Sequence, residues 1–186
     1  MQPELEKQSA CPFCNSALTD AIFGFVPSDY FGSVLCFGTD DEFLLRTRDA
    51  YPDSFLMYID EPNAQRLFKE RHAECSRKLY VNPLPLNNVG SLRFDLILSK
   101  NILHNFAHNL SEMIDFICYT VMTDDGYFVF CEKSAEIGGM NVVEVLSTYL
   151  TVEKEIVLPD SIAGICRKKG FLLASVRPFN SILQIG

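Results

Sequence analysis

Two histidines four residues apart, His104 and His108, are the side chains of this chain best suited to acid–base or metal chemistry. On one helix face such a pair could bind a metal ion, but the three residues between them do not include the glutamate of the zinc-protease pattern. A neutral imidazole can instead take a proton from a nucleophile. We therefore predict no metal at this pair, and His104 as a catalytic residue on the substrate side.

A second candidate for metal chemistry is the pair Cys11-x-x-Cys14 near the N-terminus. Thiolates at this spacing can share a zinc ion, but no second pair follows, so the pair is interpreted as two reduced thiols. The chain has seven cysteines: Cys11, Cys14, Cys36, Cys75, Cys118, Cys131 and Cys166. Four of them lie in apolar stretches, which is typical of free, buried thiols in a reducing compartment: Cys36, Cys118, Cys131 and Cys166.

Acidic and aromatic clusters each allow two interpretations. Asp40, Asp41 and Glu42 could bind a cation, or could be the negative charges that a helix N-terminus favours. The turn residues of 124–126, Asp-Asp-Gly, predict a simple turn. The aromatic residues of the N-terminal segment are either a lid over an apolar substrate or a segment packed on the sheet. They are Phe23, Phe25, Tyr30 and Phe31.

The elements that must position these residues follow from short apolar runs that end at glycine, proline or polar residues. Five runs predict strands: Ser33–Phe37, Phe55–Ile59, Lys78–Val81, Arg93–Ser99 and Tyr127–Cys131. Helical patterns at 40–51, 62–73 and 111–122 separate most of them. Apolar strands that do not alternate and are separated by helices indicate a parallel sheet covered on both faces.

The last third of the chain predicts the elements that close the sheet. They are a helix at 141–150, a strand at 152–158, a short helix at 161–169 that ends at Gly170, and an antiparallel pair of strands at 171–176 and 181–185. The prediction is a single Rossmann-like, doubly wound α/β domain. Its seven-stranded sheet is mainly parallel, with an antiparallel closing strand.

The order of these elements and the residues at the strand ends resemble the class I S-adenosylmethionine-dependent methyltransferases. Four segments carry the resemblance: Val34–Thr39, Tyr58–Asp60, Phe94–Ser99 with Ile102–Asn105, and Asp125–Phe130. It covers residues 31–186 as one methyltransferase-like domain, and residues 1–30 remain as an N-terminal segment that carries the Cys-x-x-Cys pair.

The resemblance implies that S-adenosylmethionine is the cofactor and that it binds beyond the carboxyl ends of the strands. The cofactor-binding residues that it implies are Gly38, Thr39, Asp60, Glu61, Asn82, Leu84 and Ser99. Gly38 lets the backbone approach the ligand, and Asp60 accepts hydrogen bonds from the ribose hydroxyls. Asn82 accepts from the adenine amino group, and Leu84 covers the ring.

The first loop departs from the family's pattern. Cys36 stands where the family has an acid, Gly38 is the one glycine that remains, and Asp40 and Asp41 follow it. Two carboxylates near the carboxylate of the cofactor repel it unless a cation intervenes. This degenerate motif implies cofactor binding that is weak or lost.

Composition limits the function classes. The chain has 186 residues, a mass of 21.0 kDa and a net charge of −8, which favour one domain and make nucleic acid an improbable partner. No apolar run approaches the roughly 20 residues that span a membrane, and the polar N-terminus is unlike a secretory signal, so a cytoplasmic location is expected.

The function predicted from these observations is methyl transfer from S-adenosylmethionine to a small or medium acceptor. Such catalysis depends mostly on positioning, so the sequence does not name the acceptor. The alternative is a non-catalytic relative that serves as an interaction or regulatory module for a protein partner. A third interpretation is a different nucleotide bound in the same cleft. The sequence leaves the oligomeric state open.

Overall fold

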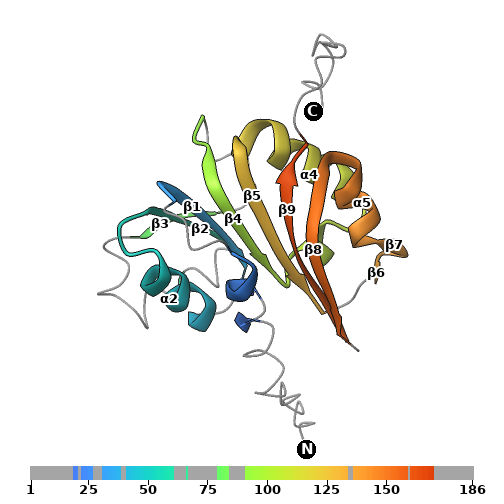
Figure 1. Cartoon of the computed structure of the whole chain (residues 1–186), viewed down its shortest axis with the longest axis horizontal. Helices are drawn as coiled ribbons and strands as arrows, with labels where there is room; N and C mark the ends of the chain where they lie inside the picture. Colours follow the sequence, from blue (N-terminus) through green and yellow to red (C-terminus); the bar gives the residue numbers. More distant parts are fainter. Residues whose placement is uncertain are drawn as a thin grey trace, which may run out of the picture.

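The computed structural model of the chain describes residues 19–20, 22–26, 31–38, 41–60, 66, 79–83, 91–133, 136–158 and 160–169. Within these ranges the chain forms one twisted sheet with helices on both faces (Figure 1). No described helix is long and apolar enough to cross a membrane. The predicted helix at 62–73 lies outside the described residues except for Arg66, which is helical.

Seven strands form the main sheet, in the order β3-β2-β1-β4-β5-β9-β8. The strands are β1 (Ser33–Gly38), β2 (Phe55–Asp60), β3 (Leu79–Pro83), β4 (Phe94–Lys100), β5 (Met122–Glu132), β8 (Leu150–Leu158) and β9 (Ser161–Lys168). The first five pair in parallel, and β9 pairs antiparallel with β5 and β8. The predicted seven-stranded, mainly parallel sheet with an antiparallel closing strand is confirmed.

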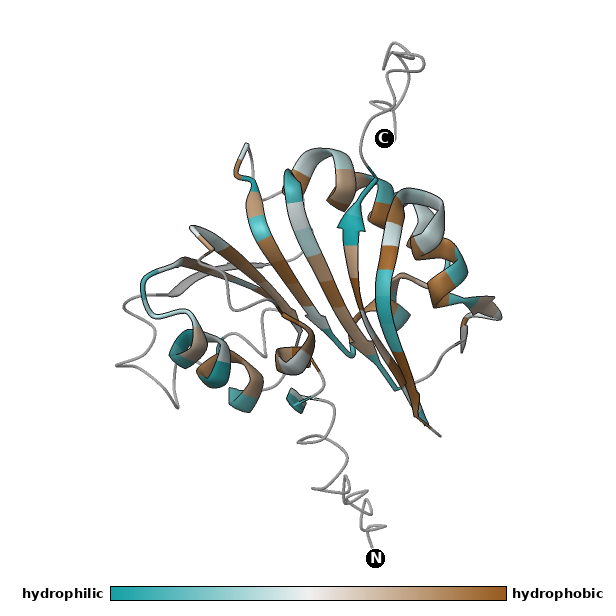
Figure 2. Cartoon of the chain, viewed as in Figure 1, coloured by the Kyte–Doolittle hydropathy of each residue, from teal (hydrophilic) through white to brown (hydrophobic). Residues whose placement is uncertain are grey.

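Two apolar cores lie on the two faces of this sheet, which explains why its central strands are apolar at nearly every position (Figure 2). On one face, α2 (Asp41–Ala50) covers the sheet with Phe43 and Leu44. The other face is covered by α4 (Leu110–Phe116), the π-helix η4 (Ile117–Val121) and α5 (Val142–Tyr149).

The described part of the N-terminal segment packs on the α2 face. Ile22 is fully buried there, and the Phe23 ring lies 5.8 Å from the Phe43 ring. Phe31 is also buried and contacts Tyr51 and Tyr127 edge-on. These contacts favour the packed segment over the lid, and Tyr30 lies outside the described residues.

The short helix predicted at 161–169 is wrong, because this segment is the strand β9 between β5 and β8. A short apolar run has no period that separates a buried strand from a buried helix. Gly164 shows the constraint: a Cβ there would lie 2.7 Å from the Phe130 ring and 2.9 Å from the Lys154 carbonyl oxygen. The antiparallel pair predicted at 171–176 and 181–185 lies outside the described residues.

The boundary between the predicted helix at 111–122 and the fifth strand is also wrong. The helix becomes a π-helix at Ile117, and β5 begins at Met122, so residues 124–126 belong to the strand and not to a simple turn. Phe94 pairs with Met122 and Leu96 pairs with Tyr127, so β5 bulges between these pairs. The bulge places Asp124 outside the regular ladder, at the amino end of the strand.

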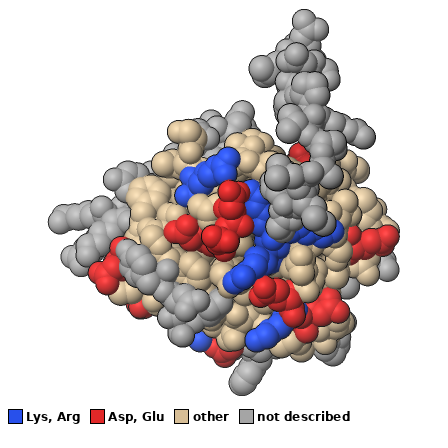
Figure 3. Space-filling view, turned by 45° about the horizontal axis from the view of Figure 1, so that its top comes forward, with Lys and Arg blue, Asp and Glu red and all other residues tan. Residues whose placement is uncertain are grey.

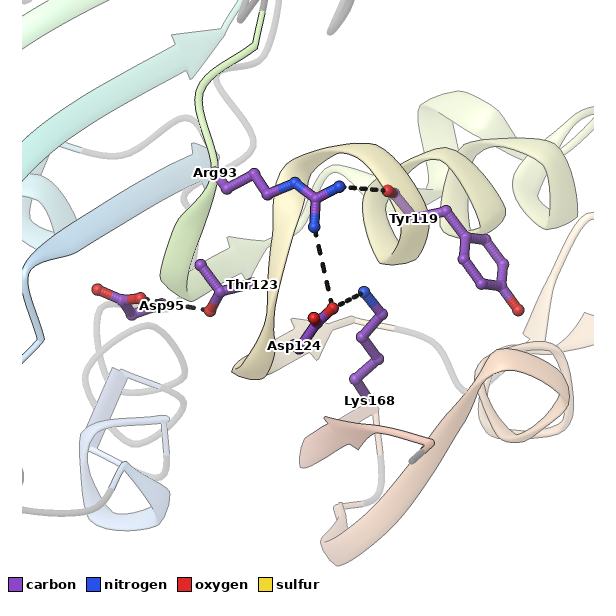
Figure 4. Close-up of polar contacts among 6 residues, drawn as sticks. All are labelled: Arg93, Asp95, Tyr119, Thr123, Asp124 and Lys168. Carbon is purple, nitrogen blue, oxygen red and sulfur yellow. Dashed lines mark hydrogen bonds and ion pairs between the residues drawn. The ribbon is translucent and has the colours of Figure 1, made fainter. Parts of the chain in front are cut away.

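The amino edge of the parallel strands, at the top of Figure 1, is crowded with charges of both signs (Figure 3). Lys168 donates to Asp124 at 2.8 Å, and Arg93 lies between Asp124 and the Tyr119 carbonyl oxygen (Figure 4). Nearby, Asp95 accepts hydrogen bonds from the amide and hydroxyl of Ser33 and from the Thr123 hydroxyl. The side chains of this edge therefore bond largely to one another.

Four cysteines of the described ranges are free and buried in the two cores, as their apolar surroundings predict: Cys36, Cys118, Cys131 and Cys166. Burial raises the thiol pKa of each of them to about 12, because the thiolate would lose its hydration. They therefore pack as small apolar side chains. Cys11, Cys14 and Cys75 lie outside the described residues.

Candidate functional site

The carboxyl ends of the five parallel strands meet at one edge of the sheet, at the bottom of Figure 1. The register pairs Gly38 of β1 with Lys100 of β4, and Ile59 of β2 with Asn82 of β3. In a doubly wound sheet the order reverses between β1 and β4, and ligands bind beside that point. Gly38 and Asp60 thus end the neighbouring strands β1 and β2, whereas Asn82, predicted to follow the third strand, lies within β3, one residue before its end.

The remaining cofactor residues of the sequence prediction fall into two groups. Thr39, Glu61 and Leu84 lie outside the described residues, and so do the side chains of Asp60 and Asn82. Ser99, in contrast, is described: it lies on β4 in register with Phe37 of β1. The contacts of these residues with a cofactor remain a prediction.

Two buried polar atoms at the end of β4 lack a hydrogen-bond partner among the described residues, the Ser99 hydroxyl and the Asn101 side-chain oxygen. Ser99 is 0% exposed. Asn101 has a left-handed backbone (φ 51°), and its amide donates to the Cys131 carbonyl oxygen at 2.8 Å. Buried polar atoms without partners cost free energy, and in native proteins they are found where a ligand or water binds.

The last residue of β5, Glu132, organises the segment that follows β4. The residue is 1% exposed, and its Oε1 accepts hydrogen bonds from the amides of Ile102 and Leu103 at 2.9 Å each. These amides begin the 3-10 helix η3 (Leu103–Phe106), so a carboxylate from another strand caps η3. Burial raises the pKa of Glu132, and its hydrogen bonds with Ile102, Leu103 and His104 oppose that shift.

His104 lies in the first turn of η3 and pairs with the same carboxylate. Its Nδ1 is 3.4 Å from Glu132 Oε2, and 58% of its side chain is exposed. A carboxylate accepts the proton of Nδ1, which leaves the Nε2 lone pair free and directed away from Glu132. An exposed imidazole held in this way can act as a general base, because Glu132 stabilises the imidazolium that forms.

The second histidine does not share this environment. His108 is exposed in the turn after η3, and no hydrogen bond or ion pair joins it to Glu132. Among the described side chains, no group of three or more His, Cys, Asp or Glu is arranged to bind a metal ion.

A lysine ends β4 beside the first loop. Lys100 is 2% exposed, its Nζ donates to the Thr19 hydroxyl at 2.7 Å, and it lies 5.6 Å from the centre of the Phe43 ring. A buried ammonium group is rare in proteins and needs polar or anionic partners. The backbone of Lys100 is in register with Gly38, at the strand end that the sequence predicts to bind the cofactor, and its ammonium group lies against Thr19 and Phe43.

Sequence reasoning missed both Glu132 and Lys100. The signal for Glu132 was available: it is an acid directly after an apolar strand, the same pattern that identifies Asp60. Lys100 is the last residue of β4, and Asp95 is the one charged residue among the six before it. A lysine at the end of such a buried strand is unusual and could have drawn attention to this position. Neither pattern reveals which backbone amide or hydroxyl the side chain contacts, since those lie far away along the chain.

Sequence comparisons find no known family profile that matches the chain, and no curated protein matches it either. Solved structures do match. The N-methyltransferase NodS from Bradyrhizobium japonicum WM9, in complex with S-adenosyl-L-homocysteine, superposes with a TM-score of 0.67 at 18% identity, over 84% of this chain and 88% of NodS.

Two further structures show the same architecture. The fibrillarin pre-rRNA processing protein from Methanococcus jannaschii gives a TM-score of 0.63 at 14% identity, over 78% of this chain and 70% of fibrillarin. The pyocyanin biosynthetic protein PhzM gives 0.63 at 16% identity, over 84% of this chain and 55% of PhzM. The chain therefore has the fold of the class I S-adenosylmethionine-dependent methyltransferases, as its sequence predicts.

Proposed function

We propose that this chain is an S-adenosylmethionine-dependent methyltransferase that acts on a small or medium acceptor carrying an O–H or N–H group. The observation that carries the proposal is the pair His104–Glu132, an exposed imidazole held by a buried carboxylate at the carboxyl edge of a methyltransferase fold. A positioned base is useful where the acceptor must lose a proton as it is methylated.

The chemistry assigned to the chain is proton removal and positioning. S-adenosylmethionine, when bound, supplies a methyl group that is already activated on a sulfonium. His104 Nε2 takes the proton of the acceptor as its oxygen or nitrogen becomes the nucleophile. Glu132 holds the ring through Nδ1 and balances the positive charge of the imidazolium.

The residues at the strand ends support a nucleoside cofactor. The buried hydroxyl of Ser99 and the side-chain oxygen of Asn101 have no partner in the described structure, and a polar ligand at this edge would provide one. Gly38 ends β1, which borders the switch point, and Asp60 ends the neighbouring strand β2. Lys100 supplies the cation that could offset the acids of the first loop.

The test is a calorimetric titration with S-adenosylmethionine and S-adenosylhomocysteine. We expect measurable binding with a Kd above about 10 μM, because the first loop keeps a single glycine. Asp60→Ala should weaken it by roughly 1.5–3 kcal/mol through the loss of a charge-assisted ribose contact. Asp53→Ala, which removes an exposed acid before the same strand, is the matched control and should leave binding unchanged.

The same titration separates this function from the non-catalytic module. If neither ligand binds at millimolar concentration, the cofactor site is lost and the methyltransferase proposal is wrong. Binding that is equally strong in Asp60→Ala and in the parent would show that the ribose is held elsewhere.

A further inference from the structure

A two-stranded hairpin after β5 packs against the segment that carries His104. The hairpin consists of β6 (Glu136–Ile137) and β7 (Met140–Asn141), and it was not predicted from the sequence. Its two turn residues, Gly138 and Gly139, have positive φ angles of 58° and 83°. Ile137 is 3% exposed and belongs to the same apolar core as Leu103 of η3.

The contact point of the hairpin on this segment is Ala107. A Cβ added to Gly138 would lie 2.9 Å from the Cβ of Ala107, closer than side-chain carbons approach in proteins, whereas a Cβ on Gly139 would meet nothing within 4 Å. The two neighbouring glycines share the left-handed backbone, yet only Gly138 touches the segment that bears His104.

Ala107 is linked directly to His104. The Ala107 amide donates to the His104 carbonyl oxygen at 3.3 Å, in the last hydrogen bond of η3. At the other end of η3, Glu132 accepts from the Ile102 and Leu103 amides. The short helix is therefore held at its start by a carboxylate and at its end by the hairpin.

The hairpin is itself anchored on both sides. Before it, Ile137 packs in the core. After it, the Asn141 side chain accepts hydrogen bonds from the Val143 and Glu144 amides at 2.9 and 3.4 Å and so caps α5. A side chain added to Gly138 would for this reason displace η3 rather than the hairpin alone.

We propose that Gly138 is a positioning residue for His104: the hairpin turn sets the end of η3 and, through it, the direction of the imidazole toward Glu132. The inference rests on the proposed function of His104 as a base. The Nδ1–Oε2 distance of 3.4 Å is at the long end for a hydrogen bond, so a small shift of η3 breaks the pair.

The experiment compares Gly138→Ala with Gly139→Ala. Both variants place alanine at a positive φ, 58° and 83°, so both carry backbone strain, and Gly138→Ala alone adds the contact with Ala107. The first readout is the nitrogen chemical shifts of the His104 ring, which report the nitrogen that carries the proton. We expect Nδ1–H in the parent and in Gly139→Ala, and a shift toward Nε2–H in Gly138→Ala.

The second readout is catalytic. Gly138→Ala should lower kcat by about 10- to 100-fold while KM for S-adenosylmethionine stays unchanged, since a misplaced base affects the chemical step. Adding Ala107→Gly to Gly138→Ala removes the clashing carbon and should restore both the ring signal and kcat. A merely structural role would lower the melting temperature without changing the ring signal.

A further variant guards against a failure of Gly138→Ala to fold. Ala107→Val enlarges the same contact from the other side, leaves the backbone of Gly138 unchanged, and should give the same change in the ring signal. The proposal is overturned if Gly138→Ala and Gly139→Ala have the same ring signal, or if Ala107→Gly fails to rescue. If His104→Ala retains full activity, the proposed function fails instead, and the ring signals still test the positioning.

Discussion

Charged and hydroxyl side chains lie at both the amino and the carboxyl ends of the parallel strands, but buried polar atoms without a partner are found, among the described residues, at the carboxyl end. At the amino edge, Asp95 accepts two hydrogen bonds from Ser33 and one from Thr123, and Asp124 pairs with Lys168. Figure 4 shows the contacts with Thr123 and Lys168. At the carboxyl edge, the Ser99 hydroxyl is buried and has no partner in the described structure, and the His104 ring is more than half exposed.

This difference distinguishes polar groups that stabilise the fold from polar groups that are available to a ligand. Polar groups that satisfy one another stabilise the fold and leave nothing for a ligand to bond. Buried groups without partners reduce stability, and an exposed base contributes little to it, so both are better explained by a bound molecule. The comparison predicts that substitutions at the carboxyl edge change binding and turnover, whereas those at the amino edge change stability.

The largest expected effect is the loss of the base. His104→Ala should lower kcat by about 10²- to 10⁴-fold with an acceptor found among phenols, hydroxy acids and amines, while cofactor affinity stays the same. Production of S-adenosylhomocysteine measures the rate. His108→Ala is the matched control, because His108 is exposed four residues further on. Equal activity of both variants would remove His104 from the mechanism.

The next largest effect is expected at Glu132, where one substitution should change turnover and stability in separable ways. Glu132→Gln keeps acceptors for the Ile102 and Leu103 amides, but its NH₂ group donates to Nδ1 and moves the ring proton to Nε2. Turnover should fall by at least about 10-fold, since Nε2 can then no longer accept a proton.

The pH dependence of the free energy of unfolding should also differ between Glu132→Gln and the parent. Burial raises the pKa of Glu132. The contribution of Glu132 to the free energy of unfolding of the parent is therefore greatest below the ordinary carboxyl pKa and decreases as pH rises through the raised value. Glutamine does not ionise, so the free energy of unfolding of the variant relative to the parent should increase between pH 4 and 7. Urea unfolding at several pH values measures this, and a free energy of unfolding of the variant relative to the parent that decreases as pH rises would contradict the burial argument.

A substitution at the amino edge should lower stability and leave cofactor binding unchanged. Asp95→Ala removes the acceptor of the Ser33 amide and of two hydroxyls, and should lower the free energy of unfolding by about 1–3 kcal/mol. Calorimetric affinity for S-adenosylmethionine should not change. Weaker cofactor binding in this variant would mean that the two edges are coupled through β4.

The smallest effect should come from Ser99→Ala. The substitution removes a buried hydroxyl that lacks a partner, so the ligand-free protein should be as stable as the parent or slightly more stable. Cofactor affinity should fall by about 1 kcal/mol if the ligand uses this hydroxyl. Thermal melting with and without ligand shows both effects, and a destabilised ligand-free variant would mean that the hydroxyl already has a partner.

The parallel half of the fold could be predicted because its signals are local. Each of the five strands is an apolar run that ends at a glycine, a proline or a charged residue, and all five are in the sheet. The segment 161–169 was harder to predict, because it is apolar at successive positions and Gly170 follows it, a pattern that also fits a short helix with a glycine at its C-terminus. The strand character of this segment comes from pairing with β5 and β8, where Gly164 lies opposite Phe130 and Glu155, and such pairing is not visible in the local sequence.

The candidate site was predictable only as positions along strands. His104 and Asp60 follow strands that the sequence identifies, and the edge that gathers them follows from parallel pairing. The partners of His104 did not follow, because Glu132 reaches it across 28 residues and its role depends on the amides of η3. Lys100 likewise depends on Thr19, 81 residues away.

The four buried thiols make it possible to measure how the core of this protein opens. Burial raises the pKa of Cys36, Cys118, Cys131 and Cys166 to about 12, so at pH 7 each carries far less of the reactive thiolate than an ordinary thiol does. In a variant that carries serine at 11, 14 and 75, alkylation of the remaining cysteines therefore waits for the core to expose them. Cys36 reports on the α2 face, and Cys118 and Cys166 report on the opposite face. Their labelling rates would show whether the two layers separate from the sheet together or one before the other.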